Sequence, residues 1–407
     1  MGRKTRTLKA SAKLLIIILS VIMVAVLSVS AYVGSIWYVD NKMPAFSKGG
    51  EIHIYEDDNL ETVLARFNET LRPLHPKSLR RSMNIERSYE RLHPGSYKFL
   101  PTHTARYVAR AITRGWQTPV NLTIAGSIRS KEQLAEKIAS QMMIDTMEVL
   151  NGLNDSLLLA EFGTTPTKVF EIILPDTYEV YWDWDMSKLM KRFKKEHELY
   201  WNKDRRAKAQ ARGLSPEEVS VLASIVAEET HRPEEYPKVA SVYLNRLRKG
   251  MKLQACPTVC YIYDYKIRRV LFSHLANPSP YNTYLHQGLP PSPICLPGKE
   301  HIEAVLNPDS HNYLFFCANS EFDGTNVFAE TLAEHQENAR RYHQAFEEYE
   351  ARKAAEAAEA AAAAAAAEAA EAAASSEASA SETLDSDTSA SASSQAPDTV
   401  AHEAVAE

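Results

Sequence analysis

Residues 215–254 read SPEEVSVLASIVAEETHRPEEYPKVASVYLNRLRKGMKLQ, and this stretch begins with a clear helix start. Ser215 stands at the N-cap, and Glu218 follows three residues later, where its carboxylate can reach back to the cap. Pro216 lies between them at the first helical position, which tolerates proline. Apolar residues then recur at helical spacing, and they predict one buried face of the helix. They are Val221, Leu222, Ile225 and Val226.

Two adjacent glutamates close this predicted helix, and they point in different directions around its axis. With about 100° per residue counted from Val221, the apolar face is centred at roughly 70°. Glu229 falls at about 80° and Glu228 at about −20°, so Glu229 projects from the buried face. A buried carboxyl group with a raised pKa can act as a general acid. The alternative is an ion pair with a basic residue such as Arg246 or Arg248.

The blocks around Glu229 form an ordered series that is more specific than any single motif. They are ASIVAEET at 223–230, KVASVYLNRLRKGMKLQ at 238–254, PTV at 257–259 and SPYNTYLHQGLPPSP at 279–293. The series resembles the YceG-like family of endolytic murein transglycosylases. Members of that family are membrane-anchored enzymes with a LysM-like region and a lysozyme-like catalytic domain. The resemblance implies that Glu229, directly before a threonine, is the catalytic residue.

The same resemblance implies a sugar-binding groove beside Glu229. Aromatic rings next to amide and hydroxyl groups suit a sugar, which offers apolar ring faces and hydroxyl edges. For any one of these residues the alternative is packing or turn formation. The candidate substrate-binding residues are Asn245, Arg246, Gln254, Thr258, Tyr281, Asn282, Thr283 and Tyr284.

The chain departs from the family pattern at four places. Cys256 stands where many members have Asp, Ala227 replaces a Glu found in some members, Ser292 replaces a Gly and Leu296 an Asn. The change at 256 matters most, because it could weaken substrate positioning or ion pairing. One hypothesis is therefore a membrane-tethered glycan-binding or scaffold protein with lost or weak catalysis.

The main hypothesis is an enzyme that works with a single carboxyl group. Glycoside hydrolysis usually needs two carboxylates about 5–10 Å apart, whereas Glu218 lies about 16 Å along the helix from Glu229. Glu229 would instead let the C6 hydroxyl of N-acetylmuramic acid attack its own C1, since an internal nucleophile has a high effective concentration. The expected activity is a lytic transglycosylase that cuts the β-1,4 bond to N-acetylglucosamine within glycan strands. It would leave 1,6-anhydro ends and terminate strand elongation, with peptidoglycan synthases as possible partners.

The N-terminal segment predicts a membrane anchor. Residues 14–34 form a run of 21 residues without a charge, enough to span roughly 30 Å of bilayer. Basic residues precede the run, which places the N-terminus in the cytoplasm and the remainder in the periplasm, with the anchor in the cell inner membrane. The alternative is a signal peptide cleaved after Val29-Ser30-Ala31.

Charge and cysteine content exclude several classes of function. The net charge is −6, and residues 351–407 alone hold 11 acidic and 2 basic residues, a balance of −9. Residues 1–350 therefore carry +3, of which +5 comes from Arg3, Lys4, Arg6, Lys9 and Lys13. Residues 14–350 are left with about −2, so the body of the chain has no basic surplus that would indicate nucleic-acid binding. Outside the cytoplasm Cys256, Cys260, Cys295 and Cys317 could pair in three ways. Neither they nor the 13 histidines have metal-ligand spacing, so no metal and no cofactor is expected.

The rest of the chain predicts an α+β protein. Strand 51–55, helices from Asn59 and at 76–83, and strand 96–99 give a LysM-like βααβ order, followed by a helix at 104–114. Strand 120–124, a helix capped by Ser130 and one long polar helix at 186–211 come next, and 314–316 is predicted as a buried strand. The predicted domains are a cytoplasmic basic segment at 1–13, a transmembrane anchor at 14–39, a LysM-like subdomain at 50–118, a second β/α subdomain and connection at 119–185, the catalytic domain at 186–346, and a low-complexity tail at 347–407 that is helical to 374 and then disordered.

Overall fold

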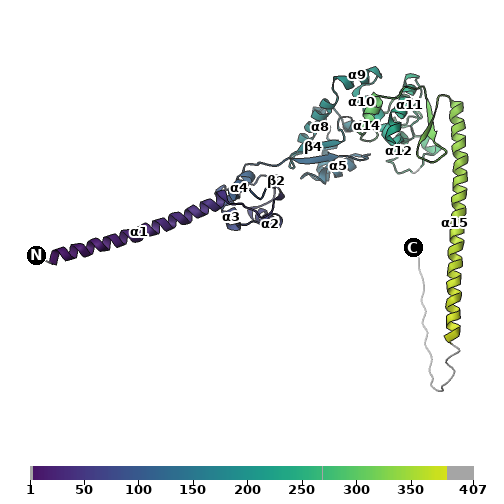
Figure 1. Ribbon diagram of the computed structural model, residues 1–407. Helices are drawn as coiled ribbons and strands as arrows, with labels where there is room; N and C mark the ends of the chain where they lie inside the picture. Colours follow the sequence, from purple (N-terminus) through teal and green to yellow (C-terminus); the bar gives the residue numbers. More distant parts are fainter. Residues whose placement is uncertain (1–2, 268, 383–407) are drawn as a thin grey trace, which may run out of the picture. The chain divides into compact units, whose positions relative to one another are not determined.

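The computed structural model describes residues 3–267 and 269–382. The chain forms two compact units, which divide between Leu314 and Phe315. Helices dominate, and each of the sheets in the described part of the chain has two strands (Figure 1). This confirms the mixed α and β composition that the sequence predicts.

The apolar N-terminal segment is one continuous helix, α1, from Arg3 to Lys42 (Figure 1). From Leu14 to Val33 its apolar side chains are exposed, and residues Ala12–Lys42 are long and apolar enough to cross a membrane. A membrane anchor and a signal sequence both fit this helix. Its last turn is tied to the following domain, because Asp40 accepts hydrogen bonds from Ser78 Oγ at 2.5 Å and Arg81 Nε at 2.8 Å.

The first domain has the predicted βααβ order. Its strands β1 and β2 pair antiparallel, with Ile52 opposite Tyr97. Asn59 forms a capping box at the start of α2, as its short polar side chain favours. The core is one apolar cluster that includes Ile54, Phe67 and Phe99. The elements are β1 Gly50–Ile54, α2 Leu60–Thr70, α3 Pro76–Ile85, β2 Gly95–Phe99 and α4 Ala105–Thr113.

The second subdomain joins two segments that are distant in sequence. Strand β3 pairs antiparallel with β4, and Leu122 lies opposite Tyr178. Both residues belong to a core that also contains Leu134 and Phe193. The elements are β3 Val120–Ile124, α5 Lys131–Ala139, α6 Thr146–Asn154, α7 Ser156–Glu161, the 3-10 turn η1 Val169–Glu171 and β4 Asp176–Val180.

The prediction of a single long helix at 186–211 is wrong. It is two helices, α8 Met186–Tyr200 and α9 Lys203–Ala211. Trp201 is buried at 1% exposure between them, and the side chain of Asn202 caps α9 by accepting a hydrogen bond from Arg205 N. Burial of one large aromatic residue therefore interrupts a segment whose helix propensity is high throughout.

Helix α10, Pro216–Glu229, carries the predicted acid Glu229 at its C-terminal end (Figure 1). Its capping box is formed as predicted, with Ser215 and Glu218 each satisfying the other's backbone N–H. The helix is buried on every side from Val219 to Val226, so it is a core helix rather than one with a single apolar face. It packs mainly against α11 Tyr236–Arg248, α12 Cys256–Ile262 and α14 Lys299–Leu306. The turn η2 Pro233–Glu235 and the short α13 Phe272–Leu275 complete this part.

The second unit contains a hairpin and a long helix. Strand β5 Phe315–Ala318 pairs antiparallel with β6 Asn326–Ala329. The predicted strand is present, but Phe315 and Phe316 are half-buried, so the expected buried strand is wrong in that respect. Helix α15, Leu332–Glu382, continues past the predicted helix end at 374 because alanine favours helix. The remainder of the predicted disordered tail, 383–407, lies outside the described residues.

Candidate active site

The carboxyl group of Glu229 lies at the C-terminal end of α10 and is held by α11. The hydroxyl of Tyr243 donates a hydrogen bond to Glu229 Oε1 at 2.5 Å. Tyr243 is 1% exposed, whereas Glu229 is half-buried, so the carboxyl group is shielded on the side of the tyrosine. Two packed helices therefore fix the position of this acid.

The environment of Glu229 favours its protonated form. Burial raises the pKa of Glu229 to about 7, and the negative charge of Glu228 acts in the same direction. The hydrogen bond from Tyr243 and the positive charge of Arg246 oppose the rise, but they are smaller effects. A carboxyl group with a pKa near neutrality can both donate and accept a proton, as a general acid and base must.

Glu228 is engaged elsewhere, although it is the next residue. Its two carboxylate oxygens accept hydrogen bonds from Arg129, with Nε at 3.0 and 3.1 Å and Nη2 at 2.8 Å. The side chain of Glu228 is 7% exposed and that of Arg129 is 39% exposed, so this bidentate ion pair is partly open to solvent. The two glutamates thus have different environments, since Glu228 is bound by a guanidinium and burial favours the protonated form of Glu229.

Two side chains from the following loops complete the surroundings of Glu229. Cys256 begins α12, and its Sγ lies 3.1 Å from the hydroxyl of Tyr284. Burial raises the pKa of the Cys256 thiol and that of Tyr284, and the charge of Glu229 adds to both rises. Cys256 therefore stands beside the acid, at the position where the sequence comparison expects an Asp.

Asn245 and Arg246 serve mainly to hold the chain around the site. Asn245 Nδ2 donates to the carbonyls of His311 at 3.0 Å and Tyr313 at 2.9 Å. Arg246 Nε donates to the Leu314 carbonyl at 2.6 Å. Both residues are at least nine-tenths buried, and the charge of Arg246 acts on Glu229. Arg246 is thus near the acid, while the amide of Asn245 binds the backbone.

The loop that carries Tyr281 and Tyr284 is held by three buried polar residues, Thr258, Asn282 and Thr283. Thr258 Oγ1 donates to the Ala255 carbonyl at 2.7 Å and lies 2.9 Å from Thr283 Oγ1. Asn282 Nδ2 donates to two backbone carbonyls of the same loop, at 2.9 and 2.7 Å. All three residues are at most 2% exposed. Packing and turn formation, the alternative raised for each of them, therefore describe what they do here.

Gln254, Tyr281 and Tyr284 retain accessible surface. Gln254 is exposed and has a positive φ of 49°, a conformation stabilised where its backbone N–H donates to the Thr283 carbonyl at 3.1 Å. Tyr281 and Tyr284 are half-buried. Of the predicted substrate-binding residues, these three are the ones whose side chains keep surface that a ligand could contact.

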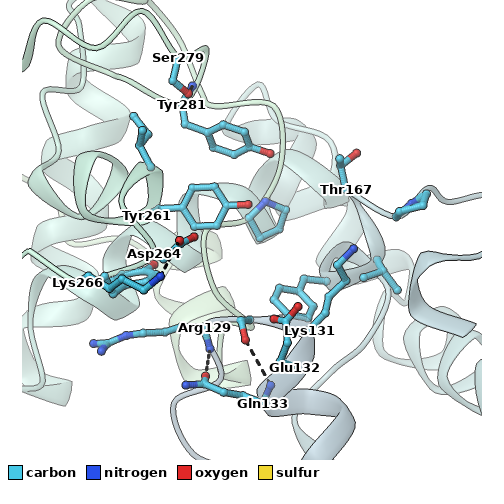
Figure 2. A pocket seen from close by; sticks show the side chains of 17 residues that line it. Arg129, Lys131, Glu132, Gln133, Thr167, Tyr261, Asp264, Lys266, Ser279 and Tyr281 are labelled. Atoms are coloured by element: carbon cyan, nitrogen blue, oxygen red, sulfur yellow. Dashed lines mark hydrogen bonds and ion pairs between the residues drawn. The ribbon is translucent and has the colours of Figure 1, made fainter. Parts of the chain in front are cut away.

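A pocket of about 820 Å³ lies beside this site (Figure 2). Glu229 is not one of its lining residues. One wall comes from α5 and the turn before it, and another from the end of α12 and the loop that carries Tyr281. The wall from α5 belongs to a subdomain whose sequence gives no sign of a site.

Comparison with known proteins gives the family. Residues 52–341 match the YceG-like family. The chain belongs to this family. A protein of Bacillus subtilis (strain 168) named endolytic murein transglycosylase is 42% identical over 129 residues, which cover 32% of this chain and 35% of that protein.

Other relatives of this YceG-like chain are more distant. A protein of Streptococcus pneumoniae serotype 2 (strain D39) with the same name is 26% identical over 137 residues, covering 32% of this chain and 25% of that protein. The matches thus span between a quarter and about a third of the curated relatives. A crystal structure of a putative yceG-like protein from Listeria monocytogenes has 23% identity and a TM-score of 0.47, covering 71% of this chain and 98% of that one.

Three residues of the YceG-like site were missed in the sequence. Tyr243 is not among the predicted site residues, although a hydroxyl on an apolar helix face usually has a buried partner, which here is Glu229. Arg129 and Tyr261 come from segments with no motif, so only the fold brings them near Glu228 and Tyr281. All four cysteines are free, so none of the three possible pairings forms.

Proposed function

We propose that this YceG-like protein is a lytic transglycosylase that cuts the β-1,4 bond between N-acetylmuramic acid and N-acetylglucosamine within peptidoglycan strands. The observation that carries the proposal is the environment of Glu229. Burial raises the pKa of this carboxyl group to about 7, and a hydrogen bond from Tyr243 holds it in place. The relatives from Bacillus subtilis and Streptococcus pneumoniae are named endolytic murein transglycosylase, which supports the same substrate.

The chemistry proposed for Glu229 has two steps at one carboxyl group. Protonated Glu229 gives its proton to the glycosidic oxygen as the bond to C1 breaks, and the N-acetylglucosamine side leaves as an alcohol. The resulting carboxylate then takes the proton of the C6 hydroxyl while O6 bonds to C1, which restores the acid. The product is a 1,6-anhydro end, and no water is consumed.

Two features of the site favour the internal nucleophile over hydrolysis. The neighbouring carboxyl group, Glu228, is held by Arg129 and is therefore not free to activate a water. The position expected to carry an Asp is Cys256, whose pKa is raised, so it offers no anion near neutral pH. A mechanism with one carboxyl group needs neither.

The finer assignments are part of the proposal. The βααβ domain would be LysM-like and bind glycan, and the α-helical part around α10 would be lysozyme-like. Helix α1 would anchor the chain in the cell inner membrane with its N-terminus in the cytoplasm and its domains in the periplasm. If the protein terminates glycan strands near the membrane, it would act beside the peptidoglycan synthases that elongate them, and these synthases would be its partners.

Mass spectrometry of digested peptidoglycan tests the proposal. Full-length protein in detergent should release fragments whose muramic acid ends are one water lighter than hydrolysed ends. Reducing muramic acid ends would identify a muramidase and a second carboxylate. Glycan binding without any cleavage would favour the scaffold hypothesis, in which Cys256 marks lost catalysis.

A further inference from the structure

The pocket beside the active site is built from two parts of the chain (Figure 2). From the second subdomain come residues 129–133, 166–167 and 169–170, and from the part around α12 come residues 261–262, 264–266, Ser279, Tyr281 and Pro293. Its volume of about 820 Å³ lies within the range of roughly 300–1,000 Å³ usual for small-molecule sites.

The charges around the pocket largely cancel, which decides what kind of ligand fits. Arg129 is paired with Glu228, and Lys266 Nζ lies 3.2 Å from Asp264. Lys131 and Glu132 add one charge of each sign at the start of α5. A phosphate or a peptide carboxylate would find no surplus of positive charge here. A neutral ligand with many hydroxyl groups suits these walls better.

Aromatic side chains give the pocket a surface for apolar ring faces. The rings of Tyr261 and Tyr281 lie 4.7 Å apart between centroids, at an angle of 44°. Figure 2 shows the Tyr261 ring between Tyr281 and the turn at Arg129, with both tyrosine hydroxyls directed toward the side that carries Thr167. Aromatic faces beside hydroxyl, amide and carboxylate groups are the chemistry that recognises a pyranose.

Two elements connect this pocket with Glu229. Helix α12 begins at Cys256, beside Glu229, and carries Tyr261 into the pocket five residues later, about 7.5 Å along its axis. The loop that follows runs from Tyr281 in the pocket to Tyr284, which contacts Cys256. Helix α12 and this loop therefore each extend from the surroundings of Glu229 into the pocket. A single glycan strand could reach both places.

We infer that this pocket is a saccharide subsite that holds a sugar of the same strand beyond the bond cut at Glu229. The inference rests on the proposed function and adds the part of the substrate that sets product length. An enzyme that cuts within strands has to bind sugars on both sides of the bond. The second subdomain supplies one wall of that binding site through Arg129 and Thr167.

Two variants of the full-length protein test the subsite. Tyr261→Ala removes the aromatic surface, and Thr167→Trp fills the pocket from an exposed position on the opposite wall without disturbing the core. Tyr263→Ala is the matched control, because Tyr263 lies on the same helix end but does not line the pocket. All three are made with and without Glu229→Gln.

Binding of a soluble N-acetylglucosamine hexamer to the Glu229→Gln proteins is the first measurement. Tyr261→Ala and Thr167→Trp should each weaken it about three- to tenfold relative to the control, the range expected for one aromatic contact. In the active proteins, both should shift the length distribution of anhydro-ended products. Equal binding and equal product lengths in all three would overturn the inference.

The outcomes separate this inference from the proposed function. If the wild type releases no anhydro ends, the proposed function fails, while hexamer binding still reports on the pocket. If it releases them and the pocket variants match the control, only the subsite fails. A muramyl tripeptide that competes for the pocket better than the sugar hexamer would overturn the saccharide assignment in favour of the peptide stem.

Discussion

At the scale of residues, the division of labour between two adjacent glutamates is the central feature. Glu229→Gln keeps the shape of the side chain but cannot carry a proton, so activity should fall about 100-fold or more. Its fold should be kept, and its stability should decrease less than that of the wild type as pH rises from about 4.5 toward 7. Among the carboxyl groups that the structure describes, only Glu171, whose pKa burial also raises to about 7, still contributes such a decrease. In the wild type that decrease follows because a carboxyl pKa raised from 4.5 to about 7 favours the folded state only while protonated.

Glu228→Gln is the matched control, and the ion pair predicts a different effect for it. Losing the bidentate partner of Arg129 should cost on the order of 1–2 kcal/mol of folding free energy, since Arg129 is partly exposed and the pair partly screened. Activity per folded molecule should stay within a few-fold of wild type. Equal loss of activity in both variants would contradict the assignment of the acid to Glu229.

Tyr243 tests how the pKa of Glu229 is set. Its hydrogen bond stabilises the ionised carboxylate and so lowers the pKa of Glu229. Tyr243→Phe should therefore raise that pKa above about 7, and the alkaline limb of the activity profile should move to higher pH because the acid keeps its proton longer. Profiles of the rate against pH for both proteins measure this. A limb that moves to lower pH would show that the hydroxyl has another role.

At the scale of elements, the start of α10 is an independent test of the fold. Ser215 Oγ accepts the hydrogen bond of Glu218 N at 3.2 Å, and Ser215→Ala removes it. Loss of an N-cap costs about 1 kcal/mol, so the thermal midpoint should fall by a few degrees. Ser187→Ala, an exposed serine in the first turn of α8, is the control and should change little. A midpoint unchanged in both would mean that α10 depends on packing alone.

The same helix shows what could be predicted from sequence and what could not. The cap of α10 is local, so four residues at fixed spacing were enough to place it. The burial of α10 on all sides depends on α11, α12 and α14, and the apolar spacing suggested only one buried face. The break at Trp201 and the pocket wall at Arg129 are also tertiary effects. The buried environment of Glu229 agrees with the helix face that the sequence predicts, and its role as the acid stays a prediction. The hydrogen bonds of Asn245, Thr258 and Asn282 to loop backbone could not be predicted, because they depend on the tertiary fold.

At the scale of the whole molecule, the C-terminal region offers a simple test. From residue 351 to 369 the side chains of α15 are exposed, and alanine and glutamate give this helix little to pack with. Deleting residues 351–407 should therefore leave the rate of the purified enzyme unchanged, measured as anhydro ends released per minute. Deleting 332–407 is the contrasting truncation, since α15 packs against the hairpin of β5 and β6. A large fall in rate with the shorter deletion would show that the tail belongs to the enzyme.

Helix α1 decides where the enzyme acts. An anchor keeps residues 1–40 on the mature protein, whereas a signal peptide cleaved after Ala31 leaves a new N-terminus at Tyr32. The anchor is favoured because α1 runs without a break to Asp40, which Ser78 and Arg81 bind, so the membrane segment is joined directly to the first domain. Sequencing the N-terminus of the membrane-extracted protein should find the original end.

Protease added to the outer face of spheroplasts should then degrade the chain beyond about residue 40, at the end of a helix long enough to cross the bilayer. An N-terminus at Tyr32, or full protection from the protease, would contradict the proposed topology.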